Sequence, residues 1–186
     1  MGRVCGIQNG ATAFHPQGAT VMTQIMVDVT ALGGGTVLLL AVVLAGGFLA
    51  VQRRWLTLVL VVVGTTSGSI AVTLIKGLVA RVRPPLDERL VAVSSASFPS
   101  GHAANSAIVY LTLALLLVQT VHGHAARVYI LAATAVLVVL IGVSRLYLHV
   151  HWPSDVVGGW VFGTIWALGW WALGRKLGAD TRAQPR

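Results

Sequence analysis

The sequence predicts an all-α integral-membrane protein, built as a helical bundle of about five transmembrane helices. Of its 186 residues, 56% are hydrophobic and only 10% are charged, and the mean hydropathy is +0.82. Soluble domains average about a quarter charged residues, so a membrane is the expected solvent. The apolar residues also form continuous runs and do not alternate with polar ones, which favours helices over barrel strands.

The first 31 residues are expected to form an N-terminal segment with one amphipathic stretch. In "ATVMTQIMVDVTALGG", the side chains of Val21, Ile25, Val29 and Leu32 fall on one face of a helix. This spacing is typical of a short helix that lies in the membrane interface. A loosely ordered tail is the alternative that the sequence leaves open.

Five apolar runs predict a transmembrane domain over residues 32–178, followed by a polar C-terminal tail over residues 179–186. A helix needs about 20 apolar residues to cross a hydrocarbon core of ~30 Å. The second run reaches that length easily, whereas the fourth is short. Small residues in "GTTSGS" and "GGWVFGTIWALG" are expected to let helices pack closely. The runs cover residues 32–51, 55–78, 103–121, 128–143 and 156–173.

Polar residues gather in three clusters that this topology places on one side of the membrane. Lys76 ends the second run and Arg83 follows it, "PSGH" at 99–102 opens the third run, and "SRLYLHVHWPSD" at 144–155 joins the fourth run to the fifth. Three cations, Lys76, Arg83 and Arg145, therefore lie at helix ends around one mouth. Converging cations predict an anionic ligand, and phosphate suits the bidentate geometry of arginine.

The "PSGH" cluster is itself compatible with anion binding. Ser100 is a good N-cap for the helix that follows, and Gly101 permits close approach of the backbone. A helix N-terminus with free N–H groups attracts anions. The alternative is that Ser100 only caps the helix.

Two histidines and one aspartate supply groups that can carry out acid–base or nucleophilic chemistry. Neutral imidazole can attack a phosphoryl group and imidazolium can donate a proton, which are possible roles for His151 and His102. Asp155 lies four residues after His151 and could hold one of its ring nitrogens. Asp155 also suits the first turn of a helix that begins after Pro153, and both interpretations can hold together.

Together, the three clusters resemble the signature of the type 2 phosphatidic acid phosphatase superfamily. That signature runs Lys-x6-Arg-Pro, then Pro-Ser-Gly-His, then Ser-Arg-x5-His-x3-Asp. It is matched in order by "KGLVARVRP" at 76–84, "PSGH" at 99–102 and "SRLYLHVHWPSD" at 144–155. Any one of these matches alone would be weak, but all three with their internal spacing are specific.

The resemblance implies a membrane phosphatase that works without metal or cofactor through a phosphohistidine. It implies that His151 is the nucleophile, that Asp155 orients it, and that His102 protonates the leaving oxygen and later activates water. The implied substrate is a lipid phosphate, such as a polyprenyl diphosphate, phosphatidylglycerol phosphate or phosphatidic acid. The residues that would bind the phosphoryl oxygens are Lys76, Arg83, Ser100, Gly101 and Arg145.

The chain departs from the family pattern in three ways. Membrane members usually have six spanning helices, whereas five are counted here, and the missing one would precede residue 32. His149 stands where many relatives carry a small residue, often glycine; it lies outside the motif and is expected to have no chemical role. The loop over residues 85–98 is too short to hold a lid domain.

Other classes of protein are less compatible with the sequence. A membrane anion transporter would place charges along helix interiors, whereas here they lie at helix ends. Vanadium haloperoxidase chemistry occurs on a similar pocket, but in soluble relatives. Nucleic acid is not an expected partner despite the net charge of +8, because the cations are scattered and form no basic face.

The distribution of basic residues predicts the orientation of the bundle. The end with the three clusters holds six of the thirteen Lys and Arg residues, and the other end holds seven. Setting aside Lys76, Arg83 and Arg145 as phosphate ligands leaves three against seven. By the positive-inside rule, the C-terminus is then cytoplasmic and the active site faces the outer surface. The Ala-, Val-, Gly- and Arg-rich composition hints only at a bacterium with a GC-rich genome. The expected location is a bacterial inner membrane.

Overall fold

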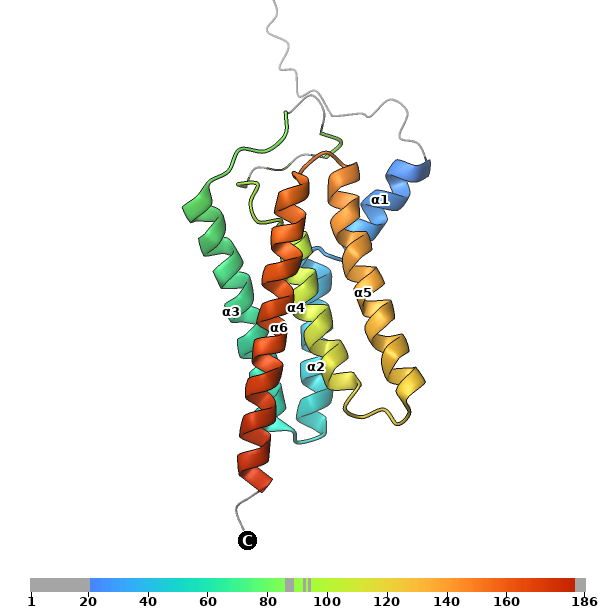
Figure 1. Ribbon diagram of the computed structural model, residues 1–186, viewed down its shortest axis with the longest axis vertical. Coiled ribbons are helices and arrows are strands. Elements are labelled where there is room, and N and C mark those ends of the chain that lie inside the picture. The colour runs from blue at the N-terminus through green and yellow to red at the C-terminus, as the bar shows by residue number, and fades with distance from the viewer. Residues whose placement is uncertain (1–20, 86–88, 92, 94, 183–186) are drawn as a thin grey trace, which may run out of the picture.

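A computed structural model describes residues 21–85, 89–91, 93 and 95–182, and over these residues the chain is all-helical. No strand occurs within the described residues, which confirms the predicted fold class. The five apolar runs correspond to α2 through α6, and an additional short helix, α1, precedes them (Figure 1). Residues 1–20 of the expected N-terminal segment, and residues 183–186 of the expected tail, lie outside the described part. The helices are α1 (Val21–Ala31), α2 (Gly35–Val51), α3 (Trp55–Val79), α4 (Gly101–Leu117), α5 (His124–Tyr147) and α6 (Pro153–Arg182).

The helices make this an integral membrane protein. Each of α3, α5 and the part of α6 up to Gly178 is long and apolar enough to cross a membrane alone. The pair α1 and α2 meets the same condition only jointly, with a bend of 42° between them. Helix α4 is apolar but shorter, with 17 residues. It can be short because it lies inside the bundle, where neighbouring helices surround it.

Helix α1 shows that residues 21–31 form a helix, which was one of the two alternatives for this segment. Its 11 residues span only about 16 Å, too little to cross a bilayer. It packs against α5, and the apolar side chains of Val21 and Ile25 on it, and of Leu32 just after it, are exposed. That α1 lies in the membrane interface stays a prediction. It occupies the place in the chain where a sixth family helix was expected.

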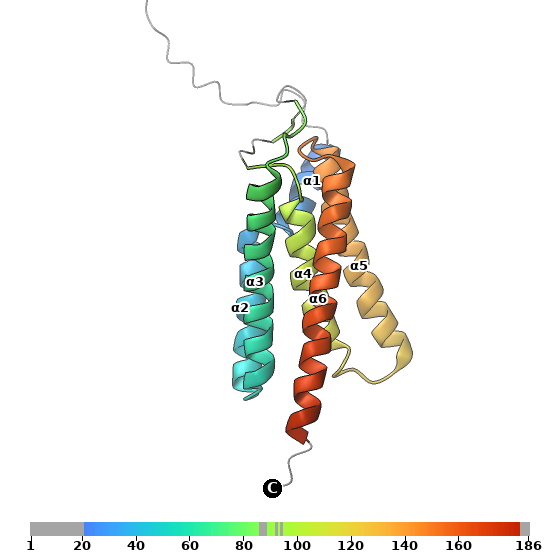
Figure 2. The ribbon, with the colours of Figure 1, turned by 60° about the vertical axis from the view of Figure 1, so that its left-hand side comes forward.

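Helix α4 is the centre of the bundle. It packs against α3, α5 and, most extensively, α6, and both ribbon views show it enclosed by these neighbours (Figures 1 and 2). Ala103, Ala104, Ala107 and Ile108 on α4 are completely buried. The small side chains of the three alanines allow the backbones of neighbouring helices to come close, which is how helices associate in lipid.

Glycines make the contact between α4 and α6 possible, as the small-residue segments predicted. A Cβ atom at Gly163 would lie 2.6 Å from the carbonyl oxygen of Ala104, and one at Gly159 would lie 2.9 Å from that of Ser100. Both contacts are with backbone, which cannot move aside as a flexible side chain can. Gly68 on α3 is also closely packed, but against side chains: a Cβ there would lie 2.8 Å from the indole nitrogen of Trp166.

The connectivity brings the three polar clusters to one end of the bundle. The C-terminal ends of α3 and α5 and the N-terminal ends of α4 and α6 all lie at the upper end in Figure 1. The α2–α3 turn, the α4–α5 connection and the C-terminal end of α6 lie at the opposite end. The segments that carry the candidate functional residues are therefore neighbours in space.

Replacing Gly163 by alanine should destabilise the protein, because the new methyl group would overlap the backbone of α4. We expect a loss of about 1–3 kcal/mol, the usual cost of overpacking a core, seen as a lower melting temperature of the purified protein in detergent. Gly169→Ala on the same helix is the matched control, since a Cβ there meets nothing within 4 Å. Equal melting temperatures for the two variants would contradict the proposed importance of the α4–α6 contact.

Candidate active site

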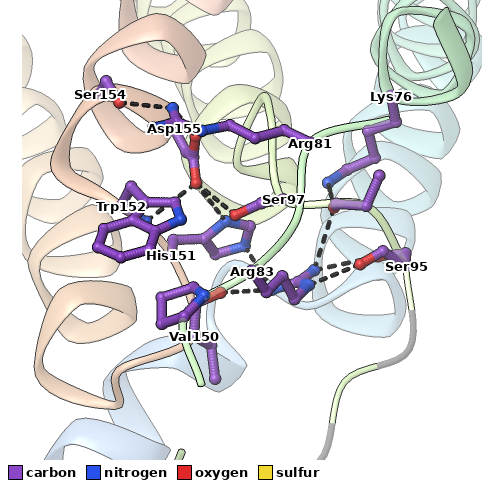
Figure 3. A network of polar contacts seen from close by, with 12 residues as sticks. Lys76, Arg81, Arg83, Ser95, Ser97, Val150, His151, Trp152, Ser154 and Asp155 are labelled. Carbon is purple, nitrogen blue, oxygen red and sulfur yellow. Dashed lines mark hydrogen bonds and ion pairs between the residues drawn. The ribbon is translucent and has the colours of Figure 1, made fainter. Parts of the chain in front are cut away.

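Asp155 lies at the centre of the polar network and is completely buried in the first turn of α6. Its carboxylate accepts hydrogen bonds from Arg81 Nη1 at 2.8 Å, from Ser97 Oγ at 2.5 Å and from the backbone N–H of Trp152 at 2.9 Å (Figure 3). The bond to Trp152 reaches back to the residue before the helix, as the carboxylate of a capping box does. Asp155 therefore stabilises the start of α6, as one sequence interpretation predicted. Its Oδ2 atom also lies 3.5 Å from His151 Nδ1, which makes no hydrogen bond, so the orienting role of Asp155 toward His151 stays a prediction.

His151 lies in the turn between α5 and α6, buried between Asp155 and Arg83. Its Nδ1 atom is 3.5 Å from Asp155 Oδ2, and its Nε2 atom is 3.2 Å from Arg83 Nη1. Arginine can only donate hydrogen bonds, so Nε2 is assigned as the acceptor and Nδ1 as the protonated nitrogen. Burial, together with the charge of Arg83, lowers the pKa of His151 to about 3. At neutral pH the imidazole is therefore uncharged, with its Nε2 lone pair available.

Arg83 contacts the protein with its whole guanidinium group. Nε and Nη2 bond to the carbonyl and hydroxyl oxygens of Ser95, at 2.6 and 3.1 Å, and Nη2 also lies 3.4 Å from the carbonyl of Ala96. Nη1 donates to the carbonyl of Val150 at 2.6 Å and faces His151. The structure thus places this predicted phosphate ligand as a clamp between residues 95–96 and the turn that carries His151.

Lys76 ends α3 close to the start of α4. Its Nζ atom donates to the carbonyl of Ala96 at 2.8 Å. A Cβ atom at Gly101 would lie 3.5 Å from the Cε atom of Lys76, which is an ordinary contact distance. The ammonium group is therefore next to the first turn of α4, and the lysine stem lies over the helix end.

The N-terminus of α4 presents free donors. Ser100 occupies the N-cap position but its hydroxyl makes no capping bond, and its Oγ atom is buried without a hydrogen-bond partner. The helix begins at Gly101, so the first N–H groups have no acceptor within the helix. His102 follows in the same turn, beneath Gly33, where a Cβ atom would lie 3.4 Å from the His102 ring.

Arg145, near the end of α5, is buried with 4% of its surface exposed. Its Nη1 atom donates to Thr30 Oγ1 of α1 at 3.0 Å, whereas its Nε atom is buried without a partner. A buried cation with an unused donor is costly unless an anion completes its contacts. Arg145, Arg83 and Lys76 all lie close enough to His102 to act on it electrostatically.

His149 lies outside the motif, and that it has no chemical role stays a prediction. Its side chain is exposed, and its backbone has a positive φ of 53°. This left-handed conformation favours glycine, which explains physically why a small residue suits the position.

Three residues that contact the site were missed by sequence analysis. Arg81 pairs with Asp155 and stacks over the ring of Trp152 at 6.0 Å, while Ser97 bonds Asp155 and Thr30 bonds Arg145. Only Arg81 carried a usable signal, because it stands two residues before Arg83 in a chain with few charges. Ser97 and Thr30 are small polar residues of a kind that occurs throughout the sequence.

The chain is similar in sequence to proteins named as phosphatases. The chain is 38% identical over 148 residues to phosphatidylglycerophosphatase B of Bacillus subtilis, covering 77% of this chain and 71% of that protein. It is also 38% identical over 68 residues to the undecaprenyl-diphosphatase of Sulfolobus acidocaldarius, but it covers only 29% of that protein.

A solved structure shares the fold. It is the crystal structure of a transmembrane PAP2 type phosphatidylglycerolphosphate phosphatase from Bacillus subtilis, with a TM-score of 0.74 and 31% identity, and the match covers 88% of this chain and 78% of that one. A family model described as the PAP2 superfamily matches residues 55–179, which include all three motif clusters. With motifs, bundle and relatives in agreement, this chain belongs to the PAP2 superfamily.

Proposed function

We propose that this protein is a membrane phosphatase that hydrolyses a lipid phosphate or diphosphate through a phosphohistidine on His151. The observation that carries the proposal is a pair of buried donors without partners, Arg145 Nε and Ser100 Oγ. Both belong to motif residues, and both lie at the end of the bundle that holds His151. Unpaired buried donors are rare in folded proteins, and a phosphoryl group would supply the acceptors that they lack.

In the first step, His151 Nε2 attacks phosphorus and the bond to the lipid oxygen breaks. The Nη1 N–H of Arg83, which faces Nε2 at 3.2 Å, would turn to a phosphoryl oxygen as the N–P bond forms. The proton on Nδ1 faces Asp155, so the carboxylate stabilises the positive charge that develops on the ring. His102 would give a proton to the leaving oxygen, and a nearby phosphate anion favours the protonated form that this role needs.

In the second step, water attacks the phosphohistidine and inorganic phosphate leaves. His102 would take the proton from this water, and the N–P bond to His151 would break. Lys76, Arg145 and the α4 N-terminus would hold the phosphoryl oxygens through both steps. Positioned charges of this kind stabilise the transition state because they need no reorganisation.

The proposed substrates follow from the place of the site and from the relatives. The site lies at one end of a bundle of apolar helices, where a headgroup can enter while its acyl or prenyl chains stay in the bilayer. Relatives are named as phosphatases of phosphatidylglycerophosphate and of undecaprenyl diphosphate. We therefore propose these two headgroups and phosphatidic acid as the first substrates to test.

Purified protein in detergent should release phosphate from at least one of these lipids, and His151→Ala and His102→Ala should each lower the rate by at least about 10³-fold. His151→Ala removes the proposed nucleophile of the first step. His102→Ala removes the group proposed to donate the proton in the first step and to accept it in the second. The measurement is phosphate release from the three lipids. A phosphoenzyme trapped from the wild type should be labile in acid and stable in alkali.

The matched control is His149→Gly, which removes the neighbouring histidine and suits the left-handed backbone there. It should retain close to wild-type activity. An inactive His149 variant beside an active His151 variant would show that the nucleophile is assigned to the wrong histidine. Absence of phosphate release from every lipid by folded wild-type protein would contradict the proposed function itself.

Activity should persist in EDTA and be inhibited by vanadate, which mimics a phosphoryl group in transfer. The cations around the site would supply the charge neutralisation that a divalent metal gives in other phosphatases. No group of three potential metal-ligating side chains occurs within the described residues, while Asp87 and Glu88 lie outside them. Phosphate release should be assayed after dialysis against EDTA, with and without added Mg²⁺. Strict dependence on Mg²⁺ would overturn the proposed mechanism.

The active site should face the outer surface of a bacterial inner membrane. Arg81 pairs with Asp155, so setting it aside as well leaves, by the sequence count, two cations predicted at that end against seven at the other. In a Cys5→Ser background, a cysteine at Val82, which is 81% exposed, should react with an impermeant maleimide in intact cells. A cysteine at the exposed Gln52, at the other end of α3, should react only after lysis. The reverse labelling pattern would place the site inside.

A further inference from the structure

A cavity lies at the end of the bundle opposite to the proposed active site. It has a volume of about 750 Å³ and is formed by the α2–α3 turn, the first turns of α3, the C-terminal half of α4 and the C-terminal part of α6. In Figure 2 these parts of α3 and α6 are the lower ends of the two helices, far from the loops that carry His151. Pockets of this size commonly hold small molecules.

Three arginines line this cavity. Arg53 and Arg54 belong to the short α2–α3 turn, and Arg175 extends from α6. Arg175 lies over the ring of Trp171, with 5.0 Å between its guanidinium carbon and the ring centroid. None of the described residues that line the cavity is acidic. The three cations therefore share one cavity without an opposing carboxylate among these residues, and their mutual repulsion would be relieved by an anion.

The rest of the lining is mostly apolar and includes three tryptophans. Trp55 and Leu56 at the start of α3 are 59% and 43% exposed, so the rim of the cavity faces the lipid. The indole N–H of Trp171 is buried and has no hydrogen-bond partner. Tryptophan and arginine together are typical of the membrane interface. A ligand that combines an anionic head with an apolar body matches both parts of this lining.

We propose that this cavity binds the headgroup of an anionic phospholipid from the leaflet at that end of the bundle. The phosphate would lie among Arg53, Arg54 and Arg175, and the Trp171 N–H would donate to a headgroup oxygen. The acyl chains would lie along the exposed apolar side chains at the start of α3. Basic pockets between membrane helices bind such headgroups in the same way. The site is separate from the proposed active site and contains none of its residues.

Purified protein in a non-ionic detergent tests this proposal through its melting temperature. A ligand that binds the folded state raises that temperature as its concentration increases above its dissociation constant. Phosphatidylglycerol should raise it by several degrees, while phosphatidylcholine and inorganic phosphate should raise it little. The double variant Arg54→Gln, Arg175→Gln should lose at least half of the shift. Gly178→Phe, which fills the cavity where a Cβ meets nothing within 4 Å, should lose it as well while keeping all three arginines.

Two single-charge controls test whether the lipid binds at this cavity or at another cationic position. Lys176→Gln removes a neighbouring cation on α6 that does not line the cavity, and Lys76→Gln removes a cation at the proposed active site. Both should retain the full shift. A shift that survives the double variant, or that Lys76→Gln abolishes, would place the lipid elsewhere and overturn the proposal. An equal shift with inorganic phosphate would also overturn it, because the apolar part of the lining would then contribute nothing.

Discussion

The carboxylate of Asp155 is completely buried, and a buried carboxylate is tolerated only where hydrogen-bond donors surround it. Here the donors come from three segments that are far apart in the chain: Arg81 after α3, Ser97 before α4 and the backbone N–H of Trp152 before α6. One side chain therefore holds together the loops at this end of the bundle. His151 lies beside the same anchor, with its Nδ1 atom 3.5 Å from that carboxylate.

The anchor works because α4 and α6 pack so closely. Gly159 and Gly163 let the α6 backbone approach that of α4, and the N–H of Ser100 donates to the carbonyl of Asp155 at 2.9 Å. The N-termini of the two helices are thus joined directly. This contact brings the donors of the α4 N-terminus next to the segment that carries His151, so the packing of apolar helices decides the geometry of a polar site.

The two ends of the bundle use their arginines differently. At the proposed active site, Arg83 and Arg145 are largely buried, and Arg83 uses its donors on carbonyls and on His151. At the opposite end, Arg54 and Arg175 are exposed beside tryptophans. A buried, hydrogen-bonded cation has a defined geometry, which suits chemistry, whereas an exposed cation near lipid is free to adapt to a headgroup.

The sequence by itself determined the membrane-spanning runs and the three motif clusters, because hydropathy and spacing are local properties of the chain. The small-residue segments also allow the close helix contacts that the sequence predicted, because the small size of glycine is a local property of the chain. Only the tertiary structure decided that Arg83 clamps the backbone at residues 95–96 and that Arg81 pairs with Asp155, 74 residues away. It also decided that Thr30 of α1 reaches Arg145. Such partners depend on how whole helices pack, and no local pattern of residues encodes that.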